Sequence, residues 1–196
     1  MYRFYLAAVD MLPSAFLLIP LFGFLNMIYF HNTRKSILYF LLSCYLSVVY
    51  VLVGLPNITY IRPELNLNLV PFIGMIGDFK NSLLNILLFV PLGIAFPLLW
   101  REFRTQKNTV LLGFSVSLVI ELLQLLTFRA TDINDLITNT LGTHLGFICS
   151  KQLFGKYHPV ADAKKREAVI VIAVVLIVMF FVYPFVSAAL WNFILS

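Results

Sequence analysis

Polar side chains that could do chemistry are concentrated between residues 78 and 146, inside a chain that is otherwise strongly apolar. Asn81 and Asn85 open one membrane-length apolar segment, and Glu121 and Gln124 interrupt the next. Such carboxylates and amides can move protons, bind a hard cation, or hydrogen-bond a sugar or peptide headgroup. Because polar groups are costly in lipid, they usually face a partner, a cavity or a substrate.

Helical spacing places these residues on common faces, because side chains three or four positions apart lie on the same side of a helix. One face comprises Asp132, Asp135, Asn139, Gly142 and Gly146. Its acidic half would meet water or a headgroup, whereas its glycine half permits close helix approach. The other two faces comprise Asp78, Asn81 and Asn85, and Glu121 with Gln124. Three polar faces in consecutive helices predict a shared site.

The composition predicts an integral membrane protein with a single transmembrane domain over residues 1–196. The chain is 61% hydrophobic and 12% charged, about half the charged share of soluble domains. Its net charge of +5 comes from Lys and Arg in short loops, which orient a membrane protein and predict no nucleic-acid partner. Cys44 and Cys149 lie in apolar stretches without metal-ligand spacing, so both are expected to pack as small apolar residues.

Apolar windows of about 20 residues predict an all-α, multi-span transmembrane bundle of about six helices. The expected spans are Met11 to Phe30, Ser36 to Leu55, Asn81 to Trp100, Asn108 to Phe128, Ile133 to Cys149 and Ala168 to Leu195. The fifth segment is short and polar, so whether residues 133–149 span fully stays open. A further apolar piece, Val70 to Ile76, is too short to cross and is expected to be interfacial or re-entrant.

Loop charges predict the orientation of these spans. The positive-inside rule favours six spans with both termini outside the cytoplasm, because the basic loops then share one side. The unusual polar residues gather on the opposite, extracellular side. The inner ends of the spans are expected to carry only ordinary loop charges, among them Arg34 and Lys35.

Two blocks of this region resemble the motifs of the VanZ-like family. The first has the pattern N-x-x-x-N, an apolar run and F-x-P-x-G, filled by Asn81, Asn85, Phe89, Pro91 and Gly93. The second has E-x-x-Q, an arginine and D-x-x-D-x-x-x-N-x-x-G-x-x-x-G, filled by Glu121, Gln124, Arg129, Asp132, Asp135, Asn139, Gly142 and Gly146. The resemblance covers a core of about residues 70–150. It implies a small multi-pass protein of the bacterial cell membrane, some relatives of which lower susceptibility to teicoplanin-type glycopeptide antibiotics.

Three functions fit these residues. The first is an outward-facing pocket that binds an envelope lipid, a wall precursor or a glycopeptide, with Arg129 pairing a phosphate or carboxylate. The second is an intramembrane enzyme acting on a lipid-linked headgroup through Glu121, Asp132 and Asp135 as bases or cation ligands. The third is purely structural, with the polar groups bonding the helices together, although each such bond contributes only about 1 kcal/mol in membranes.

We favour the binding role. The expected ligand-binding residues are Asn81, Asn85, Glu121, Gln124, Arg129, Asp132, Asp135 and Asn139. No catalytic residue, metal or cofactor is assigned, because no nucleophile or metal motif is present and His144 has no companion histidine at ligand spacing. The expected partners are membrane lipids and the envelope or glycopeptide ligand. Whether turnover occurs, and which oligomeric state the chain adopts, stay open.

Overall fold

The structure, a computed structural model, describes residues 2–63, 65–72, 78–127, 129–155, 160 and 163–195. The side chains of residues 2–12 and 193–195 lie outside this description. Contacts group the chain into unit 1, which is Met1–Ile61 with Arg166–Ser196, and unit 2, which is Arg62–Lys165. The single domain expected from the sequence stays a prediction.

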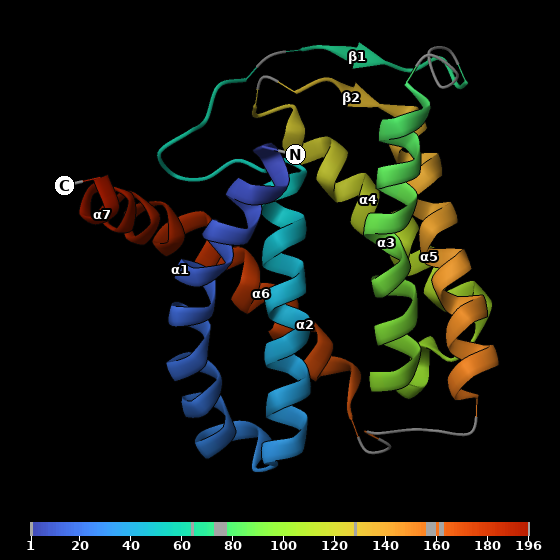
Figure 1. The fold of residues 1–196 in the computed structure, drawn as a ribbon. Coiled ribbons are helices and arrows are strands. Elements are labelled where there is room, and N and C mark those ends of the chain that lie inside the picture. The colour runs from blue at the N-terminus through green and yellow to red at the C-terminus, as the bar shows by residue number, and fades with distance from the viewer. Residues whose placement is uncertain are drawn as a thin grey trace. The chain divides into compact units, whose positions relative to one another are not determined.

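Long helices make up most of the described chain, which confirms the all-α architecture (Figure 1). They are α1 (Tyr2–Leu25) with the π-helical η1 (Asn26–Phe30), α2 (Thr33–Leu52), α3 (Phe79–Leu99), α4 (Gln106–Gln124), α5 (Ile133–Phe154), and α6 (Lys165–Ile177) with η3 (Val178–Val182) and α7 (Tyr183–Leu195). Among the described residues, five stretches are long and apolar enough to cross a membrane: α1 with η1, α2, α3, α4, and the continuous helix from α6 into α7. They coincide with five of the expected spans.

The remaining expected span is α5, which is longer than the sequence suggests and too polar to count among the apolar candidates. It continues to Phe154 and has 22 residues, or about 33 Å at the rise of an α-helix. That length is sufficient for a hydrocarbon core of about 30 Å. Its polar residues, including Thr138, Asn139 and Thr143, are buried. The polarity of α5 is therefore directed into the protein.

Two expected segments reach residues outside the described chain. The apolar piece from Val70 to Ile76 lies mostly among residues 73–77, and the expected end of the fourth span is Phe128. Within the described residues, α4 ends at Gln124. A short 3-10 helix, η2 (Arg101–Phe103), connects α3 to α4.

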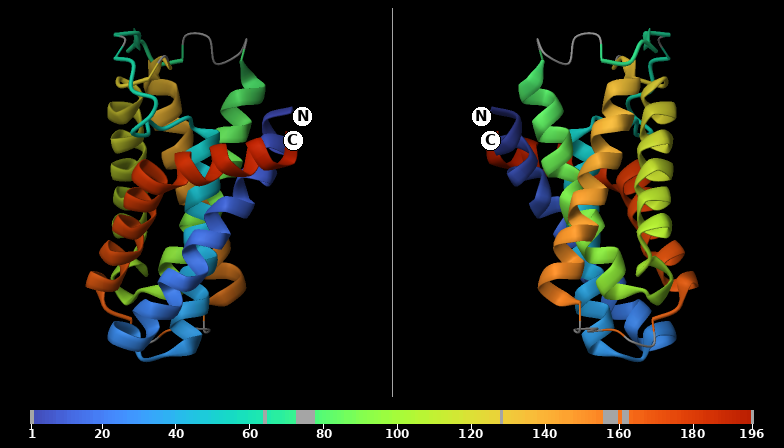
Figure 2. Two further views of the ribbon diagram at one scale, coloured as in Figure 1. Left: turned by 90° about the vertical axis from the view of Figure 1, so that its left-hand side faces the viewer. Right: turned by 90° about the vertical axis from the view of Figure 1, so that its right-hand side faces the viewer.

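Unit 2 is built on an unusually close crossing of α3 and α5, which lie side by side in every view (Figures 1 and 2). A Cβ added to Gly146 would lie 2.1 Å from the carbonyl oxygen of Val90, and one added to Gly93 would lie 2.0 Å from that of Thr143. Backbones can approach this closely only where side chains are absent. The glycine half of the face predicted from the sequence therefore lies against α3.

α4 packs on the opposite flank of α5 by the same means. A Cβ on Gly113 would lie 2.3 Å from the hydroxyl oxygen of Thr143, so the threonine fills the space that the glycine leaves. The Thr143 hydroxyl donates to the carbonyl oxygen of Asn139 at 3.0 Å. Its polarity is thereby satisfied inside its own helix, and α5 is held between α3 and α4.

A two-stranded parallel ladder closes one end of unit 2, with β1 (Leu67–Asn68) paired to β2 (Thr131–Asp132). Leu67 lies opposite Thr131, and Asn68 opposite Asp132. The alternation of Leu and Asn around β1 is visible in the sequence, but two residues are too few for a strand to be predicted from it. The ladder fixes the chain between α4 and α5.

In unit 1, α1 and α2 pack against each other as a hairpin. The turn between them depends on asparagine side chains. Asn26 Oδ1 accepts a hydrogen bond from the backbone N–H of Asn32 at 2.9 Å, and Asn32 Oδ1 caps α2 by accepting from the N–H of Lys35 at 3.1 Å. Asn is a preferred N-cap because its side chain satisfies an otherwise unpaired helix N–H. α2 therefore begins at Thr33, before the expected Ser36.

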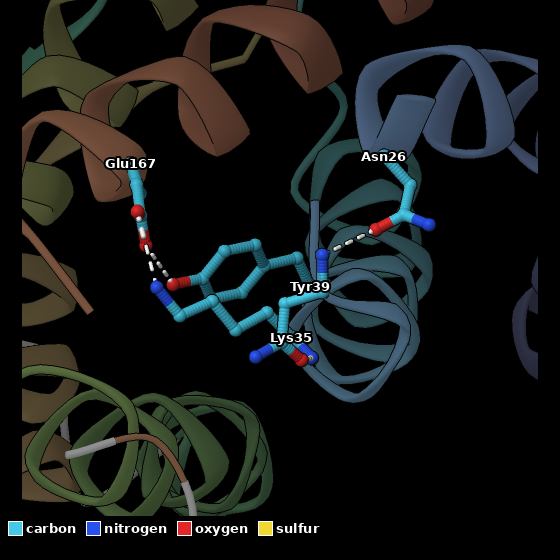
Figure 3. A network of polar contacts seen from close by, with 5 residues as sticks. Asn26, Lys35, Tyr39 and Glu167 are labelled. Atoms are coloured by element: carbon cyan, nitrogen blue, oxygen red, sulfur yellow. Dashed lines mark hydrogen bonds and ion pairs between the residues drawn. The ribbon is translucent and has the colours of Figure 1, made fainter. Parts of the chain in front are cut away.

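A buried ion pair links α2 to α6 within unit 1 (Figure 3). Lys35 Nζ lies 3.3 Å from Glu167 Oε1, and the Tyr39 hydroxyl donates to Glu167 Oε2 at 2.5 Å. All three side chains are buried. The expectation that Lys35 is an ordinary loop charge is therefore wrong, because the first turn of α2 directs it toward α6. Glu167 neutralises it, which makes burial of both charges tolerable.

Removing one partner of this pair is expected to destabilise the protein strongly. Lys35→Met should leave the Glu167 carboxylate buried without its counter-charge and lower the free energy of unfolding by about 3 kcal/mol or more. The measurement is the thermal unfolding of the full chain in detergent, with Lys107→Met as the control at an exposed lysine of α4. Equal melting temperatures for Lys35→Met and Lys107→Met would contradict the buried pair.

Candidate functional site

Most of the residues singled out from the sequence lie at the junction of the end of α4, strand β2 and the start of α5. Asp132 is central to this junction. Its backbone N–H donates to Glu121 Oε2 at 2.8 Å, and its own Oδ1 accepts from the N–H of Asn134 at 2.8 Å as the N-cap of α5. Its Oδ2 accepts from Asn68 Nδ2 at 3.0 Å. Both carboxylate oxygens of Asp132 are thus engaged in holding β1, β2 and the start of α5 together.

Glu121 is the most deeply placed carboxylate of the junction. It lies in the last turn of α4 and is 4% exposed. Besides the bond from Asp132, its backbone carbonyl accepts from the Thr131 hydroxyl at 3.0 Å. These two bonds tie both residues of β2 to one residue of α4. Glu121 therefore holds β2 against α4, in addition to carrying a charge.

Asp135 joins the junction from the first turn of α5. The Asn85 side chain of α3 hydrogen-bonds its carboxylate, and Glu121 and Asp132 are close enough to repel it electrostatically. Arg129 attracts the carboxylates of both Glu121 and Asp135. We call Asn85, Glu121, Arg129, Asp132 and Asp135 the polar cluster. Three consecutive helices contribute to it, as the helical faces predict.

Asn139 lies one turn deeper in unit 2 than Asp135. It is 3% exposed, and its Nδ2 donates to the Ser117 hydroxyl oxygen of α4 at 2.9 Å. Its Oδ1 is buried and accepts no hydrogen bond from the described residues. Ser117 in turn lies one turn from Glu121 on α4. The Ser117–Asn139 pair therefore forms the floor beneath the polar cluster.

The other two predicted residues occupy different surroundings. Asn81 is exposed on the first turn of α3, where its Nδ2 donates to Asp78 Oδ2 at 2.7 Å. Gln124 is buried at the end of α4, where its backbone carbonyl accepts from the Thr127 hydroxyl at 3.0 Å. The structure thus brings five of the eight predicted residues into the polar cluster and places Asn139 at its floor.

Three residues at the site were not singled out as site residues from the sequence: Asn68, Ser117 and Asn134. Asn134 Oδ1 accepts from the backbone N–H of Phe72 at 2.7 Å and so holds the segment after β1. The four-residue spacing of Ser117 from Glu121 is the sequence signal that could have identified it. Ser115 bonds back to its own helix, at 2.8 Å from the carbonyl oxygen of Leu111.

The side chains that could contact a ligand at this site are mainly carboxylates and amides. In the described part of the chain, no three His, Cys, Asp or Glu side chains converge closely enough to hold a metal ion. His144 instead lies 3.1 Å from the Gln106 side chain. The arrangement suits hydrogen bonding and charge recognition of a polar group that reaches the end of unit 2.

Fold and site together define a multi-pass, all-α membrane protein with a polar cluster at one end of a glycine-packed three-helix unit. A family model described as VanZ/LLP1 matches residues 43–155, and the chain belongs to this family. The match includes the core of residues 70–150 expected from the motifs. The chain is 34% identical over 122 residues to Protein VanZ of Enterococcus faecium, covering 60% of this chain and 71% of that protein. No solved structure matches the chain.

Proposed function

We propose that the chain is a bacterial cell-membrane protein whose polar cluster binds a polar group of the cell envelope. The candidates are the headgroup of an envelope lipid, a wall precursor or a glycopeptide antibiotic, and binding would lower susceptibility to teicoplanin-type glycopeptides. The similarity to Protein VanZ supports the envelope role. The positive-inside rule supports an outward-facing cluster.

The observation that carries the proposal is the charge composition of the polar cluster. Glu121, Asp132 and Asp135 repel one another, with Arg129 as the attractive charge among them. Like charges held close together destabilise a fold. Helix packing alone gives no reason to keep them, whereas ionisable groups in membrane proteins usually mark a site.

A binding role also fits better than the enzymatic alternative. The Asp132 carboxylate accepts hydrogen bonds at both oxygens, from Asn134 and from Asn68. A carboxylate so engaged holds the local fold and is poorly placed to act as a free base. Glu121 and Asp135 then remain as the acids that can meet a ligand.

Replacing Arg129 with alanine is expected to abolish protection against teicoplanin without removing the protein from the membrane. The mutation removes the positive charge that attracts the carboxylates of Glu121 and Asp135, and with it a guanidinium that can orient an anionic or carbonyl group of the ligand. The measurement is the teicoplanin susceptibility of a sensitive bacterium that lacks a VanZ-family protein and expresses either variant.

The matched control is Arg101→Ala, which removes an exposed arginine of η2. Membrane abundance of each variant is measured in the same cultures. Unchanged protection by Arg129→Ala at normal abundance would rule out the proposed role of the polar cluster.

A further inference from the structure

We propose that the polar cluster recognises a protonated amine, so that the bound group is an ammonium head rather than a phosphate. This inference rests on the proposed function and names the ligand class of the same site. It is carried by two independent features of unit 2: the imbalance of charge in the cluster, and an unsatisfied buried acceptor at its floor.

The first feature is the ratio of carboxylates to cations. The carboxylates of Glu121, Asp132 and Asp135 repel one another, and Asp78 adds a further negative charge that repels Asp135. Arg129 is already shared between Glu121 and Asp135. A phosphate would have to compete with these carboxylates for Arg129, and would be repelled by them. A cation would instead relieve the repulsion.

The second feature is Asn139. Its side chain is fixed by the 2.9 Å bond from Nδ2 to Ser117, which orients the remaining Oδ1 as a buried acceptor without a donor among the described residues. A buried acceptor left unpaired costs free energy. Ser117 lies one turn from Glu121 on α4, and Asn139 one turn from Asp135 on α5. The residue that carries this acceptor is thus in the helical turn next to that of the two less engaged acids.

Both features require the same kind of partner, a positively charged hydrogen-bond donor. An ammonium group has three N–H donors and no acceptor, so it suits a site that offers carboxylates and an amide oxygen. A divalent cation fits less well, because the described residues do not bring three carboxylate, thiol or imidazole ligands together. The ligand chemistry that fits both features is therefore that of a protonated amine, bound directly or through a water molecule.

The test uses the purified full chain in phosphatidylcholine nanodiscs and amphiphiles that differ only in their head: dodecylammonium, N-dodecylacetamide and dodecyl phosphate. Dodecylammonium is expected to bind saturably and raise the melting temperature, and the acetamide and phosphate to do neither. Glu121→Gln and Asp135→Asn should each weaken ammonium binding roughly ten- to a hundredfold. Glu102→Gln, at an exposed carboxylate of η2, should leave it unchanged.

Stronger binding of dodecyl phosphate, the same melting shift with Mg²⁺ alone, or equal weakening by Glu102→Gln would each overturn the amine assignment. Phosphate binding that depends on Arg129 would overturn the amine assignment but not the proposed function, because a ligand would still bind the polar cluster. No saturable binding of any head, with unaltered teicoplanin protection by Arg129→Ala, would overturn both.

The source of the amine is resolved by two further probes, each compared with its N-acetylated form. One is phosphatidylethanolamine, and the other is a lipid-linked peptide with a free lysine amine. Preference for either free amine over its acetylated form supports the proposal and identifies the source. Equal binding of free and acetylated forms of both would contradict it.

Discussion

Gly146→Ala is expected to disrupt unit 2, although it adds only one methyl group. The new Cβ would lie 2.1 Å from the carbonyl oxygen of Val90 and 3.0 Å from the Cα of Gly93. Both are backbone atoms, so no side-chain rotation can relieve the clash and α3 must move away from α5. Overpacking typically costs about 1–3 kcal/mol, and we expect a fall in melting temperature of about 5 °C or more.

The control for this substitution is Gly23→Ala in α1. A Cβ at Gly23 meets nothing within 4 Å, so the same chemical change should be neutral or slightly stabilising through better helix propensity. Thermal unfolding of both variants in one detergent gives the comparison. A melting temperature of Gly146→Ala equal to that of Gly23→Ala would show that α3 and α5 do not approach so closely.

The glycine face of α5 and most of the polar cluster were predictable because local spacing determines them. Gly142 and Gly146 fall on the same helical face as Asp135, so a helix that packs by its glycines also directs its acid toward the same neighbours. The apolar windows likewise located the helices, since their length is set by the membrane.

Features that depend on how distant segments meet were not predictable in this way. Lys35 and Glu167 are 132 residues apart, and no single helix pattern reveals that their first turns come together. The pairing of β1 with β2 extends over two residues, too short for a periodic signal. Asn81 shares a helical face with Asn85, yet one turn is enough to leave it exposed beside Asp78.

Glu121→Gln is expected to remove the function of the protein while preserving its fold. The substituted amide keeps an oxygen that can accept from the N–H of Asp132, as Glu121 Oε2 does at 2.8 Å. It loses only the negative charge, which in turn relieves repulsion with Asp132 and Asp135. The structural role of residue 121 is thus retained and its electrostatic role is abolished.

Glu121→Leu provides the contrast, because it removes both the charge and the acceptor. The N–H of Asp132 then loses its partner, which we expect to cost about 1–3 kcal/mol of stability. If the polar cluster is purely structural, stability and function should both fall in Glu121→Leu and stay near wild type in Glu121→Gln. A binding site would lose function with either variant, but stability only with the leucine variant.

The decisive measurement is therefore teicoplanin susceptibility of the sensitive host expressing Glu121→Gln, taken with the melting temperature of the same variant. We predict a melting temperature at or slightly above that of the wild type and susceptibility equal to that of the host without the protein. Full protection by a stably folded Glu121→Gln protein would contradict a functional charge at the polar cluster.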